Sequence, residues 1–128
     1  MNSPAQRKES PMDFDQAIAA HSAWKQKLSE YLRKRDGSLK SAEVALDTKC
    51  PLGQWIHGEG SKYVKLSEFT TLKTEHTRFH KAAADVVRHA DSGKSTSEEI
   101  ALGSKSEFAN ASSAVVMAIM AVKKHAAQ

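Results

Sequence analysis

Apolar side chains recur at helical spacing along three long segments, and this period restricts the fold more than any other feature of the chain. A spacing of three to four residues matches the α-helical turn, so each segment predicts a helix with one apolar face. Asp13 is the expected N-cap of the first helix, which should end at the turn sequence 36–38. Its apolar face consists of Phe14, Ala17, Ile18, His21, Trp24, Leu28, Tyr31 and Leu32.

Two further long helices are expected downstream. The second should run from Ser61 or Lys62 to Ala90. Its apolar face consists of Leu66, Phe69, Leu72, His76, Phe79, His80, Ala83, Val86, Val87 and Ala90. The third should begin at Ser95 or Thr96, with Glu98 and Glu99 as capping-box residues. Its apolar face consists of Ile100, Phe108, Ala111, Val115, Ala118, Ile119 and Val122.

The sequence contains no alternating strand pattern and no internal repeat, so the predicted class is all-α. A short helix after Cys50, ending near His57, completes an antiparallel four-helix-type bundle with the three long helices. The length suits one domain, with residues 1–11 as a disordered N-terminal tail and residues 12–128 as the bundle.

Charge and hydropathy narrow the function classes. The net charge of +4 comes from positive and negative residues that alternate along the helices, so nucleic-acid binding is not expected. The longest apolar run, residues 114–122, is far shorter than the ~20 residues of a membrane span. The polar N-terminus is no secretory signal, and a lone cysteine cannot form an internal disulfide. The predicted location is therefore the cytoplasm.

Histidines occupy the centres of two apolar faces. His76 and His80 are one helical turn apart, His21 lies midway along the first helix, and Cys50 precedes Pro51 at the start of the short helix. The N-cap position of Cys50 favours a thiolate. These side chains could be separately hydrogen-bonded core residues, but each would then need its own polar partner. One thiolate and three imidazoles instead make a complete tetrahedral set for Zn²⁺.

The remaining histidines, His57, His89 and His125, are expected to be exposed. A zinc site with one thiolate keeps a net positive charge, so a carboxylate beside the ligands is expected, with Glu75 and Asp47 as the candidates nearest in sequence. Four protein ligands leave no open position for a reacting water, and the sequence shows no catalytic triad or phosphate-binding loop. An enzyme is not expected.

Three segments together resemble a known family. They are His21-x-x-Trp24, Cys50-x-Leu52-Gly53-x-Trp55 and His76-x-x-x-His80, and the resemblance to the chemoreceptor zinc-binding (CZB) domain extends over about residues 13–125. It implies that His21, Cys50, His76 and His80 bind one zinc ion in a helical bundle that is commonly a homodimer.

The same resemblance implies a regulatory domain of bacterial chemoreceptors or diguanylate cyclases. Its expected signal is zinc availability or oxidation of Cys50, for example by hypochlorous acid. The chain contains no receptor or cyclase segment, so it is expected to be either a free-standing member of the family or an excised domain. The output of a free-standing member should pass through a partner or through its oligomeric state.

Two alternatives remain open at this point. The zinc could be purely structural, in an interaction module with no sensing role. A di-iron protein of the hemerythrin type is also a histidine-rich helical bundle, but it needs bridging carboxylates and more histidines than the three in this predicted core.

Overall fold

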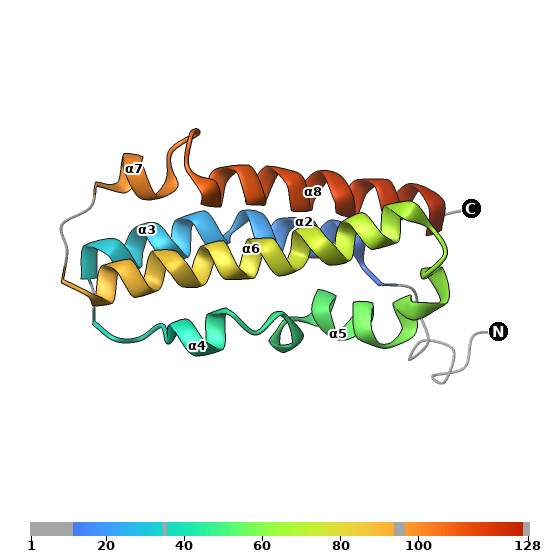
Figure 1. Ribbon diagram of the computed structural model, residues 1–128, viewed down its shortest axis with the longest axis horizontal. Helices are drawn as coiled ribbons and strands as arrows, with labels where there is room; N and C mark the ends of the chain where they lie inside the picture. Colours follow the sequence, from blue (N-terminus) through green and yellow to red (C-terminus); the bar gives the residue numbers. More distant parts are fainter. Residues whose placement is uncertain (1–11, 35, 94–96, 127–128) are drawn as a thin grey trace.

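The structure is a computed structural model that describes residues 12–34, 36–93 and 97–126. Within these ranges every regular element is helical, which confirms the predicted all-α class. The four layers of the bundle are α2 (Phe14–Ser22) with α3 (Trp24–Lys34), a segment of short helices, α6 (Ser67–Asp91) and α8 (Glu107–Ala126). Successive layers run in opposite directions (Figure 1).

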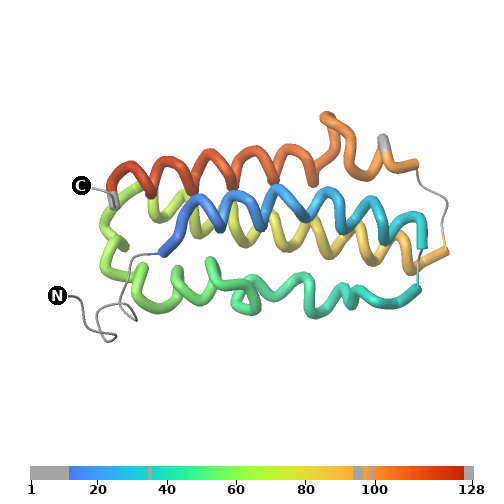
Figure 2. The backbone as a smooth tube through the Cα atoms, turned by 180° about the vertical axis from the view of Figure 1, so that it is seen from behind, coloured from blue at the N-terminus to red at the C-terminus, as the bar shows by residue number. Residues whose placement is uncertain are grey.

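The segment of short helices consists of α4 (Ser41–Val44), η1 (Asp47–Lys49), α5 (Pro51–His57) and η2 (Glu59–Tyr63). It lies along one side of α6, while α8 lies along the other (Figure 1). Seen from behind, α2 and α3 pass between α8 and this segment (Figure 2). The predicted cysteine-bearing fourth layer is therefore present, although it is a series of short α and 3₁₀ helices rather than one continuous helix.

Local signals set the helix ends. The Asp13 carboxylate accepts a hydrogen bond from the Gln16 backbone N–H at 3.0 Å, which caps α2 as expected. Gly37 follows α3 with a φ of 75°, a left-handed conformation that glycine adopts at little cost. The first helix is interrupted at Ala23, but this residue keeps right-handed helical angles, so α2 and α3 follow one another as a single layer.

The expected start of the second helix was wrong. Residues 59–63 form the 3₁₀ helix η2, and α6 begins only at Ser67. A side chain at Gly60 would lie 2.8 Å from the Trp55 ring, so the chain passes close against this indole before it turns into α6. From Phe69 onward the expected apolar face of α6 is buried.

The third helix was predicted as one element but is two. The pieces are α7 (Glu98–Leu102) and α8, and Ser106 begins the second piece by accepting a hydrogen bond from the Ala109 N–H at 3.0 Å. The short helix α7 buries Leu102, and Ile100 is 72% exposed rather than buried. Ser97 accepts a bond from the Ile100 N–H at 3.2 Å, and the expected caps at 95 and 96 lie outside the described residues.

One apolar core connects all layers. Its fully buried members include Leu28, Leu52, Leu72, Phe79 and Val115. The N-terminal segment predicted to be disordered, residues 1–11, lies outside the described residues. In the part of the chain that the structure describes, none of the helices combines the length and hydropathy needed to cross a membrane.

Candidate metal centre

Cys50 is the N-cap of α5, and the local sequence holds it there. Pro51 occupies the first helical position, where its missing N–H is not needed. Cys50 itself is extended, with φ −101° and ψ 153°, and its Sγ accepts a hydrogen bond from the Gly53 N–H at 3.4 Å. The cap therefore directs the sulfur back over the start of the helix.

The three central histidines face this sulfur from two layers. His76 and His80 lie one turn apart on α6, and His21 lies near the end of α2. All three are almost completely buried, with exposures of 0%, 3% and 3%. Cys50 is half-buried. The apolar faces predicted from the sequence bring these side chains together.

Each imidazole directs its Nε2 atom into the cluster. Cys50 Sγ lies 3.1 Å from His76 Nε2, 3.6 Å from His80 Nε2 and 3.9 Å from His21 Nε2. His76 Nε2 lies 3.1 Å from His21 Nε2 and 3.2 Å from His80 Nε2. All four donor atoms lie within 4.8 Å of one another.

These separations fit a tetrahedral ion. Zn–N bonds of about 2.0–2.1 Å and a Zn–S bond of about 2.3 Å place ligand atoms about 3.3–3.6 Å apart in a tetrahedron. The five donor–donor distances given above, 3.1–3.9 Å, surround this range. A thiolate with three imidazoles is also the soft, nitrogen- and sulfur-rich donor set that zinc prefers.

Backbone carbonyls fix two of the rings from outside the cluster. His21 Nδ1 lies 2.8 Å from the Ala17 carbonyl oxygen, and His80 Nδ1 lies 3.0 Å from that of Val44. A proton on Nδ1 leaves the lone pair of Nε2 free for a metal, so these bonds select the tautomer that a ligand needs. These acceptors were not predicted from the sequence. Ala17 could have been found as the residue one turn before His21.

The carboxylates expected beside the site behave differently. Asp47 places Oδ2 3.7 Å from His76 Nδ1. Glu75 instead forms an ion pair with Arg78 at 3.1 Å, so its expected role is wrong. Glu75 precedes His76 by one residue and is rotated from it by about 100° around the helix axis.

Burial keeps the imidazoles neutral. It is the main reason that the pKa of His76 falls to about 3, with smaller contributions from His80, His21 and His57. Burial also lowers the pKa of His21 and of His80, although their carbonyl partners oppose the shift. Neutral imidazoles are the form that binds a metal ion.

Burial acts on Cys50 in the opposite sense. It raises the pKa of the thiol, and this effect exceeds the opposing effect of the Gly53 N–H. The helix position alone therefore does not produce the thiolate expected from the sequence. A cation at the centre of the cluster would supply the missing stabilisation, because a coordinated thiol is deprotonated by its metal.

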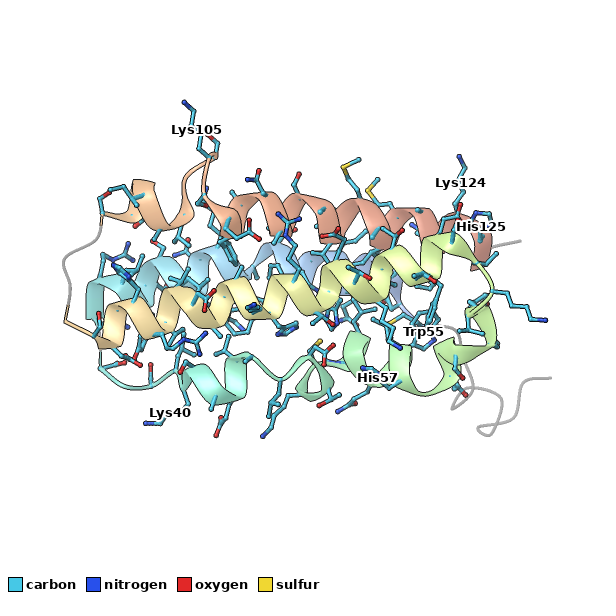
Figure 3. The ribbon with its side chains drawn as sticks, in the orientation of Figure 1. Lys40, Trp55, His57, Lys105, Lys124 and His125 are labelled. Atoms are coloured by element: carbon cyan, nitrogen blue, oxygen red, sulfur yellow. The ribbon has the colours of Figure 1, made fainter. Side chains whose placement is uncertain are left out.

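Aromatic rings and one glycine hold the cluster in place. Phe79 packs edge-on against His21 and His80, with ring centroids 5.1 and 5.5 Å away. Trp55 contacts Phe14 at 5.3 Å and turns inward from α5 (Figure 3). A Cβ atom at Gly53 would lie 1.7 Å from the Asp47 carbonyl oxygen, so this position accepts only glycine without a backbone shift.

Cys50 is also reached from outside. A surface pocket of about 240 Å³ is lined by both Cys50 and His80, and its other walls come from Trp24 and from residues between 38 and 49. The pocket is therefore a route by which a small molecule can approach the Cys50 thiol along the short-helix segment.

The three remaining histidines lie on the surface, as expected. His57 extends outward from α5, and His125 lies at the end of α8 (Figure 3). His57 lies 3.8 Å from Asp47, and His125 lies 3.3 Å from Glu68. Neither belongs to the cluster of donor atoms.

The fold and donor set define a helical-bundle metal-binding domain with a His₃Cys centre. A family model described as the chemoreceptor zinc-binding domain matches residues 21–87, a stretch that includes all four donors and more than half of the chain. The chain belongs to this CZB family, and its cofactor is zinc. No curated protein and no solved structure matched the chain.

Proposed function

We propose that this chain is a sensory and regulatory zinc-binding domain of bacterial signal transduction, of the chemotaxis or cyclic-di-GMP type. We further propose that His21, Cys50, His76 and His80 are its zinc ligands. The observation that carries the proposal is the convergence of one sulfur and three Nε2 atoms within 4.8 Å in a buried site. Membership of the zinc-binding family supports the same assignment.

The proposed output depends on the state of the short-helix segment. The cysteine side of the site lies on α5, whereas the histidines lie on α2 and α6. Zinc would join these layers, so its loss would remove the link between the start of α5 and the histidine-bearing helices. Family membership supports a signalling role in which this change alters contact with a partner, either a second copy of the chain, a chemoreceptor or a cyclase.

Two signals can change the zinc state. The first is a fall in free zinc below the dissociation constant. The second is oxidation, in which the Cys50 thiolate attacks hypochlorous acid, gains OH as a sulfenic acid and releases chloride. The pocket that reaches Cys50 supports access by such a small oxidant. Sulfenic acid is a poorer ligand than thiolate, so oxidation favours zinc release.

The proposed role is regulatory rather than catalytic. A site with four protein ligands has no open position for a substrate or an activated water. The hemerythrin alternative is not favoured, because the four clustered donors contain no carboxylate and one is a thiol. A purely structural zinc is the second candidate. Loss of a structural zinc would destabilise the domain, just as loss of a sensory zinc would, so stability alone does not separate the two roles.

The ligand assignment is tested by metal analysis of purified variants. Cys50→Ala and His76→Ala should each lose most of the bound zinc, whereas His89→Ala is a matched control because His89 is exposed on the same helix as His76. One tight zinc per chain in Cys50→Ala would overturn the assignment.

A second measurement separates sensing from a structural role. The native protein is treated with a chelator or with hypochlorous acid, and zinc content, oligomeric state and binding to a candidate receptor or cyclase are followed together. A regulatory role predicts that oligomeric state or partner binding changes with zinc release. Loss of stability with no change in either would favour the structural role.

A further inference from the structure

His76 differs from the other two imidazoles on its outer side. Its Nδ1 atom is buried and has no hydrogen-bond partner. No other buried side-chain nitrogen or oxygen in the part of the chain that the structure describes lacks one. The side chain is fully buried, so solvent does not reach this atom. His21 and His80 have carbonyl acceptors at the equivalent position.

Zinc makes this difference important. Coordination through Nε2 requires the proton of a neutral imidazole to be on Nδ1, and a buried N–H without an acceptor is destabilising. Without zinc, the proton of His76 can instead be on Nε2, which lies 3.1 Å from His21 Nε2 and 3.1 Å from Cys50 Sγ. His76 therefore needs an outer acceptor specifically when the metal is bound.

The Asp47 carboxylate is placed to be that acceptor. Its Oδ2 lies 3.7 Å from His76 Nδ1, so a movement of about 0.9 Å would make a charge-assisted hydrogen bond of about 2.8 Å. The same oxygen accepts a hydrogen bond from Thr77 Oγ1 at 3.2 Å and lies 3.8 Å from His57 Nε2. Thr77 on α6 thus keeps the carboxylate turned toward the His76 side.

Charge favours the same contact. Zinc carries +2 and the cysteine thiolate −1, so the centre has a net charge of +1 in a buried site. One carboxylate beside a ligand brings the local charge to zero, which reduces the cost of burying the ion. Asp47 side-chain exposure is 18%, so its charge is only partly screened by solvent.

We propose that Asp47 is the positioning residue of the zinc site, which orients His76 through Nδ1 and neutralises the bound ion. The assignment rests on the proposed ligand set. Asp47 lies three residues before Cys50 in η1, and Sγ lies 3.6 Å from the Asp47 carbonyl oxygen. The segment 47–50 therefore supplies both the ligand Cys50 and the hydrogen-bond acceptor for the ligand His76. Zinc binding would draw this segment toward α6 through both residues.

The test compares Asp47→Asn, Asp47→Ala and wild-type protein, with Asp85→Asn as the control. Asp85 is an exposed carboxylate on α6 that pairs with Arg88, so this control makes the same change in charge away from the cluster. The measurements are zinc affinity by competition with a chromogenic chelator, the absorption spectrum of the cobalt-substituted protein, and thermal unfolding without metal.

Asp47→Asn keeps an oxygen acceptor but loses the charge, and it should weaken zinc binding about 10-fold; Asp47→Ala loses both and should approach 100-fold. The ligand-field bands of cobalt should shift in both variants, while the metal-free melting temperature stays near that of wild type. The proposal would be overturned if Asp47→Asn bound zinc with wild-type affinity and kept the wild-type cobalt spectrum. It would also be overturned if the Asp47 variants lost as much stability without metal as with it. If wild-type protein itself bound no zinc, the ligand assignment would fail instead.

Discussion

Gly53 offers the sharpest steric test of the site. It lies in the first turn of α5, where an added Cβ would be 1.7 Å from the Asp47 carbonyl oxygen, 2.6 Å from the Asp47 carbonyl carbon and 3.2 Å from His76 Cε1. Ordinary contacts begin near 3.4 Å. The nearest clashing atoms belong to the backbone, so a side-chain rotation cannot relieve the overlap. Gly53→Ala therefore must push η1 and α5 apart.

The expected size follows from this geometry. Overpacking of a core typically destabilises a protein by about 1–3 kcal/mol, and a backbone clash belongs at the upper end. At about 4 °C per kcal/mol for a domain of this size, the zinc-loaded protein should melt about 12 °C lower. Cys50 and His76 are two of the proposed zinc ligands, and moving them apart would spoil a tetrahedral site, so zinc affinity should fall at least about 10-fold.

Gly37→Ala is the matched control. Gly37 has a φ of 75° and no atom within 4 Å of an added Cβ, so alanine there meets backbone strain but no clash. Its expected cost is about 1 kcal/mol, with zinc affinity unchanged. Both variants are compared by thermal unfolding with and without zinc and by chelator competition. If Gly53→Ala bound zinc like wild type and melted no lower than Gly37→Ala, the inference that η1 packs too closely on α5 to admit a side chain at position 53 would be refuted.

Two further predictions concern metal and pH. Zinc at 1,000 times its dissociation constant should stabilise the fold by about 4 kcal/mol, measured as the difference in melting with and without chelator; equal melting would contradict coupling of zinc to folding. Tyr31 donates a hydrogen bond of 2.5 Å to Asp91, and this bond, followed by burial, raises the Tyr31 pKa above 10.0. The stabilisation that accompanies this raised pKa is complete below pH 10 and is lost as pH rises through the folded-state pKa. Tyr31→Phe should therefore reduce the loss of stability at alkaline pH, measured by unfolding at a series of pH values. At pH 7 the same substitution should cost about 1 kcal/mol. An unchanged alkaline slope in Tyr31→Phe would refute the assignment.

Helical periodicity was sufficient to predict the bundle and the inward direction of the central histidines. His21, His76 and His80 lie on the apolar faces of α2 and α6, and a face with a period of 3.6 residues can only turn inward in a bundle. Cys50 was placed by Pro51, because proline marks a helix start. The donor atoms of these four residues meet in the structure.

The errors have a common physical cause. The second helix begins late because residues 59–63 wrap against Trp55, and the third breaks before Ser106 because that serine begins a new helix. Both are tertiary or capping effects that periodicity does not detect. The Val44 carbonyl next to His80 was not foreseen either, because residues 38–49 lack a regular period, and an acceptor on the main chain has no sequence signature.

The proposed ligands come from three separate segments, and this arrangement has a consequence for folding order. Cys50 is 29 residues from His21 and 26 residues from His76, so a bound zinc closes two long loops at once. Cross-links over loops of this length each remove about 3.5 kcal/mol of chain entropy from the unfolded state. An unfolded chain that captured zinc early would pay this entropy before its core formed. His76 and His80, one turn apart on α6, are the pair that can hold the ion first without closing a loop, and Cys50 and His21 would then be drawn onto a helix that already carries the metal.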